Sequence, residues 1–397
     1  MHGDATLNTE MSLEPPTLET AMKVKDIIIE AEAITGLKAN LPDDAINGLT
    51  QLVKSIVDEA PLSEQGLQSS KKMILNNLAN RIRVDHYLEQ HPELLQQAIE
   101  TPTFVFGLPR TGTTLLINLL AEDPARRAFI RWESLNSVPP PKASEVRTDP
   151  RYFEAQALIE QSLKYVPHIS AIHHENADSP TECQFSMSQT FCSQLFESMI
   201  DIPSYRKWFL STDYLPAFKY HKRLLQLLQT HAPGQWTLKN PWHPLYLTAL
   251  KEVFPDAQLI MTHRDPVEVV GSACSLIKHV RLLTHEHVDL EKIGSTTIDI
   301  FQRMIDNIIN YKVKYGENSI YDIQYQDIIK NPTESIHNIY RHFNQPLTNE
   351  AKNAMKKYLT DNPKGKHGKH EYILEEFGLN EAYIRSIFSD YYDRFLL

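Results

Sequence analysis

Two glycines and an arginine occupy a short segment whose residue types suit it to binding an oxyanion. Gly107 and Gly112 enclose Arg110, and an apolar run at residues 104–106, which favours a strand, comes directly before them. A helical pattern begins after Gly112. A loop between a strand and a helix presents backbone N–H groups and the positive end of the helix dipole to an anion. The segment therefore predicts a binding loop for a phosphate or sulfate group.

This loop differs from the nucleoside triphosphatase P-loop, G-x-x-x-x-G-K-[ST], at one position. Gly107 and Gly112 have the required separation and Thr114 stands at the Ser/Thr position, but Thr113 replaces the lysine. Because that lysine contacts the terminal phosphates of ATP or GTP, its absence argues against nucleoside triphosphate chemistry. The cation is instead Arg110, whose planar guanidinium suits a tetrahedral group such as sulfate. Both threonines are expected to cap the helix and to donate to the anion.

The segment PRTGTTLL resembles the 5′-phosphosulfate loop of the sulfotransferases that use 3′-phosphoadenosine 5′-phosphosulfate (PAPS). The resemblance implies that PAPS is the cofactor and that the loop residues bind it, namely Arg110, Thr111, Gly112, Thr113 and Thr114. An ordinary Gly-Pro turn between a strand and a helix is the alternative interpretation of this segment alone.

Arg264 and Ser272 form a second point of resemblance. The segment HRDPVEVVGS places the arginine at the end of a predicted strand and the serine in the next helix. In type and separation the two residues resemble the pair that holds the 3′-phosphate in cytosolic sulfotransferases. A dianionic phosphate needs a cation and a hydroxyl donor that converge from different elements. The alternative is a surface ion pair of Arg264 with Asp265 or Glu268.

Two later segments complete the resemblance. Tyr325, in the sequence YQD before an Asn-Pro turn, resembles the tyrosine that lines the adenine pocket in the family. The basic stretch at residues 364–370, KGKHGKH, resembles the C-terminal loop that closes over the cofactor's phosphates, which implies contacts from Lys364 and Gly365. The alternatives are a tyrosine packed on the sheet and a solvated charged face.

Catalysis requires cations for the developing charge and a base for the acceptor's proton. Arg110 is one cation, and Lys239 resembles the lysine of the family's K-[ST]-P strand end, with asparagine in the middle place. Three residues are candidates for the base. Glu133 has a position in the chain that resembles that of the glutamate base in tyrosylprotein-type and bacterial glycolipid-type sulfotransferases. His243 lies four residues after Lys239, whereas the catalytic histidine of cytosolic relatives lies two residues after the equivalent lysine, and His174 is the third candidate.

Strands alternate with helices through the region that carries these residues. Strands are predicted at 103–106, 236–238, 258–263 and 320–324, each followed by a helical pattern. This alternation is typical of an α/β fold with a P-loop-like, mainly parallel sheet flanked by helices. Since ligands of such sheets bind at the carboxyl ends of the strands, the predicted cations are expected to meet at one edge.

The rest of the chain suggests four parts. Residues 1–18 are polar and are predicted to be a disordered tail, and residues 19–100 are predicted to form a helical extension. Residues 101–397 are predicted to form the sulfotransferase core, with a helical insertion at about 145–232. The insertion is rich in aromatic residues, which suit either a roof over an apolar acceptor pocket or ordinary packing between helices.

Composition limits the function classes. The formal net charge of −10 argues against general binding to nucleic acid or anionic membranes. No apolar run is long enough to span a bilayer, so no stable membrane insertion is expected, and a cytoplasmic protein is the prediction. The three cysteines form no C-x-x-C pair, and no metal is expected, since arginine and lysine take the charge that Mg²⁺ neutralises in kinases.

The sequence therefore predicts a PAPS-dependent sulfotransferase. The acceptor is expected to be a hydroxyl or amine of a small-molecule, lipid or polyketide-like compound, and nothing indicates the oligomeric state. One alternative is a kinase-like enzyme with a degenerate loop, which would need a metal-binding aspartate such as Asp265 or Asp327 at a strand end. The other is a catalytically idle nucleotide-binding protein.

Overall fold

A parallel five-stranded sheet lies at the centre of the computed structural model, which describes residues 22–165, 175–363 and 372–396. The strand order is β2-β3-β1-β4-β5, and every neighbouring pair is parallel. The strands are β1 (Thr103–Gly107), β2 (Arg126–Ala128), β3 (Gln235–Lys239), β4 (Gln258–His263) and β5 (Tyr321–Gln324). The predicted α/β class and its four predicted strands are confirmed, and β2 is an additional strand.

Side chains that alternate along β1 and β4 point to opposite faces of the sheet and belong to two different hydrophobic clusters. Val105 is aligned with Lys239 on one side and with Ile260 on the other, so the three side chains share a face of the sheet. That face packs on α5 (Thr113–Ala121), α16 (Tyr325–Lys330), α17 (Pro332–His342) and α18 (Asn349–Asp361). The opposite face, with Phe104, packs on α12 (Leu215–Leu228), α13 (Leu247–Val253) and α15 (Leu290–Tyr315).

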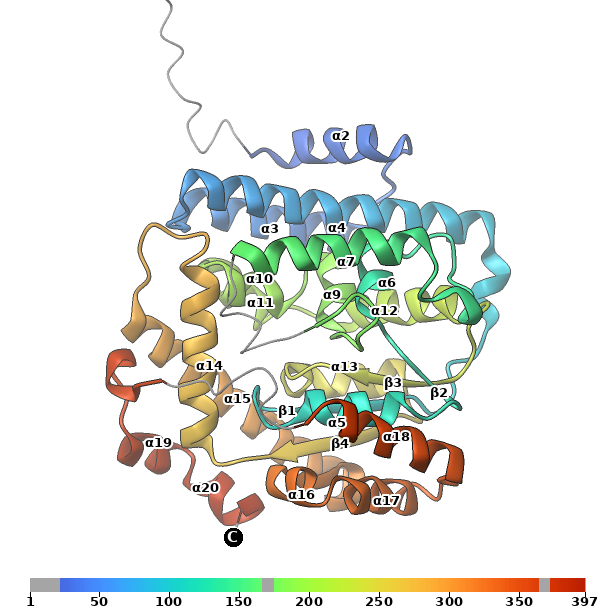
Figure 1. Ribbon diagram of the computed structural model, residues 1–397. Helices are drawn as coiled ribbons and strands as arrows, with labels where there is room; N and C mark the ends of the chain where they lie inside the picture. Colours follow the sequence, from blue (N-terminus) through green and yellow to red (C-terminus); the bar gives the residue numbers. More distant parts are fainter. Residues whose placement is uncertain (1–21, 166–174, 364–371, 397) are drawn as a thin grey trace, which may run out of the picture.

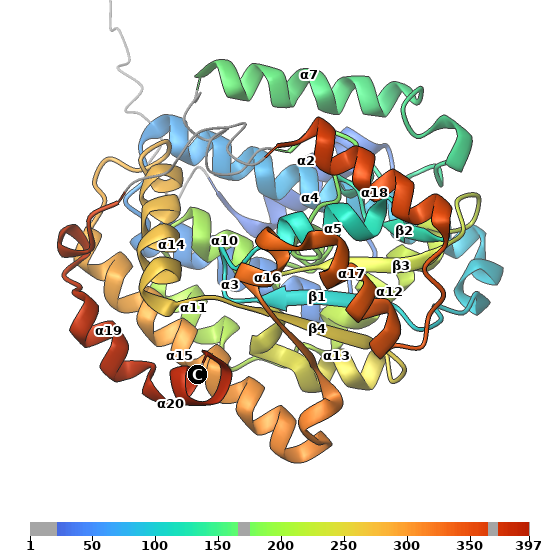
Figure 2. The same ribbon diagram turned by 60° about the horizontal axis from the view of Figure 1, so that its bottom comes forward.

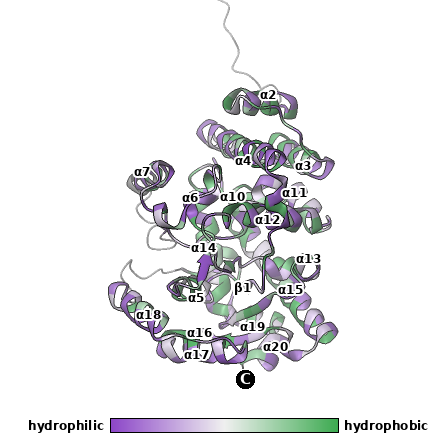
Figure 3. Cartoon of the chain, turned by 90° about the vertical axis from the view of Figure 1, so that its right-hand side faces the viewer, coloured by the Kyte–Doolittle hydropathy of each residue, from purple (hydrophilic) through white to green (hydrophobic). Residues whose placement is uncertain are grey.

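Three helices precede the sheet in the chain and are stacked on one side of the molecule, at the top of Figure 1, with the strands below them. They are α2 (Val24–Thr35), α3 (Asp43–Glu59) and α4 (Glu64–Gln90), and a 3₁₀ turn, Pro92–Gln96, follows them. The Ser63 hydroxyl caps α4 by accepting from the Gly66 backbone N–H at 3.0 Å. These helices carry both hydrophilic and hydrophobic residues (Figure 3), and their buried side chains belong to the same cluster as Phe104.

Helices of very different length connect β2 to β3. They are α6 (Arg131–Leu135), α7 (Pro150–Tyr165), α9 (Gln184–Met187), α10 (Gln194–Met199), α11 (Pro203–Phe209) and α12. Helix α7 lies at the outer edge of the molecule, away from the strands (Figure 2). In the described part of the chain, no helix is both long and apolar enough to cross a bilayer.

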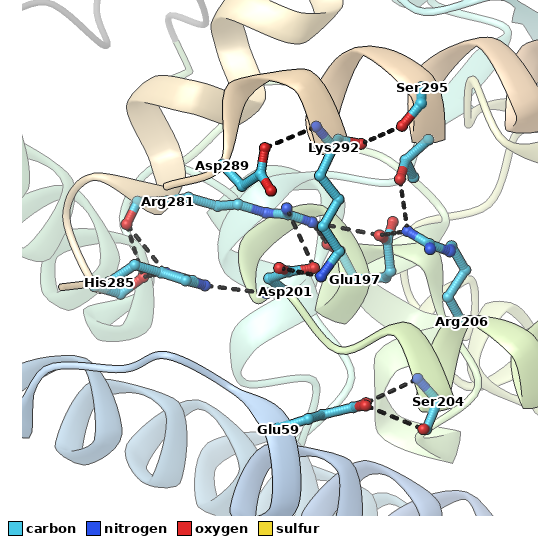
Figure 4. Close-up of polar contacts among 12 residues, drawn as sticks. Glu59, Glu197, Asp201, Ser204, Arg206, Arg281, His285, Asp289, Lys292 and Ser295 are labelled. Atoms are coloured by element: carbon cyan, nitrogen blue, oxygen red, sulfur yellow. Dashed lines mark hydrogen bonds and ion pairs between the residues drawn. The ribbon is translucent and has the colours of Figure 1, made fainter. Parts of the chain in front are cut away.

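Helix α14 (Pro266–Arg281) runs from the sheet edge to a buried ionic cluster at its far end (Figure 4). Arg281 donates to the Glu197 backbone oxygen at 2.8 Å and lies 3.3 Å from the Glu197 carboxylate, which also accepts from Arg206 at 3.1 Å. A second carboxylate, Asp201, accepts from Lys292 at 2.6 Å. The helix is therefore fixed to α10 and to the start of α15.

Candidate active site

Four segments that follow parallel strands meet at the carboxyl edge of the sheet. The loop with Arg110 follows β1, Lys239 ends β3, Arg264 follows β4 and Tyr325 follows β5. Because β1 lies between β3 and β4, the loop has Lys239 on one side and Arg264 on the other. This edge is where parallel α/β sheets bind their ligands.

Backbone geometry explains why glycine occupies position 112. Gly112 has φ +93°, and a side chain there would approach the Tyr325 ring to 2.9 Å. Helix α5 begins at Thr113 with Gly112 as its N-cap residue and without a side-chain cap, so the expected capping by the threonines is wrong. Arg110 also has a positive φ, +74°, a conformation that costs energy for a residue other than glycine.

The threonines of the loop face different ways. The Thr111 hydroxyl points into the loop, where it donates to the Leu108 carbonyl at 2.7 Å and lies 2.6 Å from the Thr262 hydroxyl. Thr113 is buried and Thr114 is exposed. Among these three threonines, Thr114 alone is exposed. Its hydroxyl lies 3.5 Å from the ammonium of Lys239, which is another predicted site residue.

Arg110, Arg264, Ser272 and Tyr325 form one contact cluster. Arg264 Nη1 donates to the Arg110 carbonyl at 3.0 Å, and Arg110 Nε donates to the Ser272 hydroxyl at 3.3 Å. The Arg264 guanidinium lies 4.3 Å from the centre of the Tyr325 ring. Burial, and after it the charge of Arg264, lower the pKa of Arg110. A bound phosphate or sulfate group would relieve this repulsion between cations.

Arg264 also pairs with a carboxylate in the first turn of α14. Its Nε and Nη2 lie 2.6 and 2.5 Å from Glu268 Oε2. The ion pair considered from the sequence is therefore present together with the predicted cluster, because the guanidinium faces both groups. Its partner is Glu268, since the Asp265 carboxylate instead caps α14 by accepting from the Val267 N–H at 2.9 Å.

Lys239 lies between the loop and Glu182, a residue that no sequence motif indicates. The ammonium is 2.9 Å from Glu182 Oε1 and 3.5 Å from the Thr114 hydroxyl, and both Lys239 and Glu182 are more than 90% buried. The Cys183 N–H donates to the Lys239 carbonyl at 2.8 Å, so this segment lies beside the end of β3. Pro180 indicates extended backbone here, but no local pattern predicts pairing with a strand so much later in the chain.

Glu133 lies on the other side of the sheet from Lys239. Its carboxylate accepts from Arg127 at 2.9 Å, and Arg127 packs on Trp236, whose side chain belongs to the cluster of Phe104. The side chain is fully buried, and burial raises its pKa. Among the described residues, no hydrogen bond or ion pair joins the Glu133 side chain to the loop or to Lys239.

His243 is likewise on the face of Phe104. Its ring lies 5.2 Å from the Phe104 ring and 5.7 Å from the Phe218 ring, with neither ring nitrogen hydrogen-bonded to a described residue. Burial, and after it the neighbouring His221, hold the pKa of His243 well below its ordinary value. This environment suits a neutral packing residue, and the structure does not bring His243 to the predicted site.

Three predicted site residues, His174, Lys364 and Gly365, lie outside the described residues. The described residue that follows the basic stretch, Tyr372, packs on α14, where its hydroxyl donates to the Glu268 carbonyl at 3.1 Å. Within the described ranges, no group of three or more His, Cys, Asp or Glu residues is placed to hold a metal ion.

A parallel sheet with a glycine-bounded loop after its central strand and cations at the neighbouring strand ends defines an α/β protein with a P-loop-like core. The chain belongs to the sulfotransferase family, whose model matches residues 102–349. It is therefore a transferase enzyme, and its chemistry is sulfuryl transfer. The predicted family membership is confirmed.

Solved structures and curated relatives agree with this assignment. Sulfotransferase STF9 from Mycobacterium avium is 31% identical, with a TM-score of 0.88 over 94% of this chain and 96% of that one. Sulfotransferase STF1 from Mycobacterium tuberculosis H37Rv is 30% identical, with a TM-score of 0.84 over 93% of this chain and 99% of that one. The chain is also 24% identical to the omega-hydroxy-beta-dihydromenaquinone-9 sulfotransferase Stf3 of Mycobacterium bovis, over 74% of this chain and 76% of that protein.

Proposed function

We propose that the chain transfers the sulfuryl group of PAPS to a hydroxyl group of a lipid-like acceptor. The observation that carries the proposal is the contact cluster in which Arg264 bonds to Arg110 and Arg110 bonds to Ser272. In it the 5′-phosphosulfate would lie on the loop and the 3′-phosphate on Arg264 and Ser272. Tyr325, in contact with both the loop and Arg264, would stack on the adenine.

Lys239 and Glu182 are the proposed groups for the transfer step. The acceptor oxygen attacks sulfur in line, the bond from sulfur to the 5′-phosphate oxygen breaks, and a sulfate ester and adenosine 3′,5′-bisphosphate result. Lys239 and Arg110 would stabilise the charge that develops on the leaving phosphate. Glu182 would take the acceptor's proton, since its carboxylate lies 2.9 Å from the Lys239 ammonium and thus beside the loop.

Two observations support a lipid-like acceptor: the name of one relative and an aromatic residue of the segment that carries Glu182. One relative is named for a hydroxylated menaquinone, which is a lipid-like quinone. The segment that carries Glu182 continues to Phe185, which is only partly buried and whose ring centre lies 3.9 Å from the Arg131 guanidinium. An apolar surface next to a buried acid–base group suits an acceptor with one hydroxyl on an apolar body.

The test is a transfer assay with ³⁵S-labelled PAPS and a lipid extract, followed by mass spectrometry for a gain of SO₃. Glu182→Gln is expected to lower kcat by about 10²- to 10⁴-fold while adenosine 3′,5′-bisphosphate still binds. The matched control is Glu145→Gln, whose carboxylate pairs with Lys142 on the surface. Near-normal turnover by Glu182→Gln would remove Glu182 from the mechanism, and no labelled product from the wild type would contradict the proposed reaction.

A further inference from the structure

We propose that the C-terminal segment, residues 381–396, positions Arg264 for the 3′-phosphate and so sets the preference for a 3′-phosphorylated donor. The segment contains α19 (Glu381–Ile387), α20 (Ser389–Tyr391) and the last turn, Tyr392–Leu396. Its side chains contact the two residues on either side of Arg264, and the Tyr391 hydroxyl also contacts the Arg264 backbone. The inference rests on the proposed binding of PAPS.

His263, the residue before Arg264, is held by three groups. Its Nδ1 lies 2.9 Å from the Tyr391 hydroxyl, its Nε2 lies 2.8 Å from Asp322 Oδ1, and its ring stacks on Phe395 with 4.7 Å between the centres. His263 is fully buried. Two of the three partners belong to the C-terminal segment, so that segment fixes the end of β4.

Asp265, the residue after Arg264, is held by the same segment. Besides capping α14, its carboxylate accepts from the Tyr392 hydroxyl and lies 3.2 Å from Arg385 Nη2. Arg385 in turn lies over the Tyr392 ring, 5.0 Å from its centre. The carboxylate is thereby kept in place by one tyrosine and one arginine.

These contacts have an electrostatic consequence for Arg264. Asp265 is its sequence neighbour, and a carboxylate free to turn toward the guanidinium would compete with a phosphate for it. Tyr392 and Arg385 hold that carboxylate on the side of the C-terminal segment, while Arg264 bonds to Arg110 and stacks on Tyr325. Figures 1 and 2 both place α19 beside α14.

The experiment measures two ligands on the intact chain by titration calorimetry. Adenosine 3′,5′-bisphosphate probes Arg264, and adenosine 5′-monophosphate, which lacks the 3′-phosphate, does not. Tyr392→Phe and Arg385→Gln are expected to weaken bisphosphate binding about three- to tenfold and to change monophosphate binding less than about twofold. In turnover, KM for the donor should rise while kcat at saturating donor stays near that of the wild type.

Controls separate positioning from a general loss of structure. Glu381→Gln removes the other carboxylate on Arg385, at 2.8 Å, and leaves Asp265 untouched, so its ligand preference should equal that of the wild type. Asp265→Asn retains an oxygen for the cap and for Tyr392 and should lose less preference than Asp265→Ala, at similar melting temperatures.

Two results would overturn the inference, and they are distinct from a failure of the proposed function. If Tyr392→Phe and Arg385→Gln leave the ratio of the two affinities unchanged, or weaken both ligands equally, the segment has no positioning role. If the wild type itself binds the bisphosphate no better than the monophosphate, the proposed 3′-phosphate site is absent, and that is seen without any variant.

Discussion

Arg264 holds an internal carboxylate where the proposed 3′-phosphate would bind. The Glu268 side chain is 52% exposed, and an ion pair of such exposure contributes little to stability. A phosphate dianion carries more charge and more acceptor atoms than this carboxylate, so it is expected to displace Glu268 from the guanidinium. The pair then acts as a competitor that the donor must replace.

Removing the competitor should strengthen donor binding. We predict that Glu268→Gln binds adenosine 3′,5′-bisphosphate about two- to fivefold more tightly than the wild type, with no change for the 5′-monophosphate. Calorimetry with both ligands checks this result. Unchanged bisphosphate affinity would mean that Glu268 remains beside Arg264 in the complex.

The two arginines of the cluster should differ in their effects. Arg264→Ala is expected mainly to weaken donor binding, because this residue contacts a phosphate that does not react. Arg110→Ala is expected to abolish transfer, because Arg110 lies in the loop proposed to hold the reacting group. Steady-state kinetics with varied donor separates the effects, and intact transfer by the Arg110 variant would remove it from the mechanism.

The sequence predicts the residues that meet in the contact cluster of Arg110 better than the residues around Lys239. Arg110 and Arg264 could be found because each directly follows an apolar strand, and parallel strands bring such ends together. Glu182 could not be found in this way, because its place depends on backbone bridges between segments far apart in the chain, Pro180 with Ile130 and Glu182 with Lys239. The position of Glu133 along the chain makes it a candidate for the base. That position does not show that the Glu133 carboxylate accepts a hydrogen bond from Arg127.

At the scale of elements, α14 is held at both ends. Its start contacts the C-terminal segment, and its end lies in the ionic cluster of Figure 4, where Glu197 accepts from both Arg281 and Arg206. Glu197 and Arg281 are more than 90% buried, so neither charge can be compensated by water. The cluster therefore fixes the helix that carries Ser272.

Loss of the Glu197 charge should destabilise the whole chain. We predict that Glu197→Gln lowers the free energy of unfolding by about 3 kcal/mol, because Arg206 and Arg281 both lose the Glu197 carboxylate and Arg281 keeps Asp201 at 3.6 Å. Urea unfolding followed by circular dichroism measures the change. The matched control is Asp58→Asn, whose partner Lys54 is exposed and whose effect should stay below about 1 kcal/mol. Equal effects in the two variants would contradict the account of the cluster.

Strand β2 is the strand that the local sequence does not predict. It consists of Arg126, Arg127 and Ala128, a composition that does not predict a strand. Both arginines are buried, and Arg126 donates to the hydroxyls of Thr103 and Thr237 at 3.0 and 3.1 Å. Because these partners come from β1 and β3, the strand is stabilised by contacts that only the folded sheet supplies.

At the scale of the whole molecule, buried neutral histidines make stability depend on pH. Burial, and after it the charge of Arg281, lower the pKa of His285 to about 4 from an ordinary value of 6.5. Burial alone lowers the pKa of His221 to about 3. Below about pH 6.5 the unfolded chain binds more protons at these groups than the folded chain does. Their contribution to stability is therefore full above that pH and is lost as the pH falls toward 4.

This dependence gives a prediction for the melting temperature. The melting temperature should fall between pH 7 and pH 5, and that of His285→Gln should fall less steeply. In the wild type, the Asp201 N–H donates to His285 Nε2 at 3.0 Å. A glutamine can accept the same hydrogen bond and does not titrate. Calorimetric scans at several pH values measure the slopes. His337→Gln is the control, because the His337 side chain is 50% exposed. Parallel slopes for His285→Gln and the wild type would refute this origin.

The most direct test of the central claim, that the sheet edge binds PAPS, is a calorimetric titration of the wild-type chain. Adenosine 3′,5′-bisphosphate without metal is compared with ATP and Mg²⁺. We predict that the bisphosphate binds at least about tenfold more tightly, because Arg264 and Ser272 have a partner in its 3′-phosphate. A preference for ATP with Mg²⁺, or no measurable binding of the bisphosphate, would contradict the account.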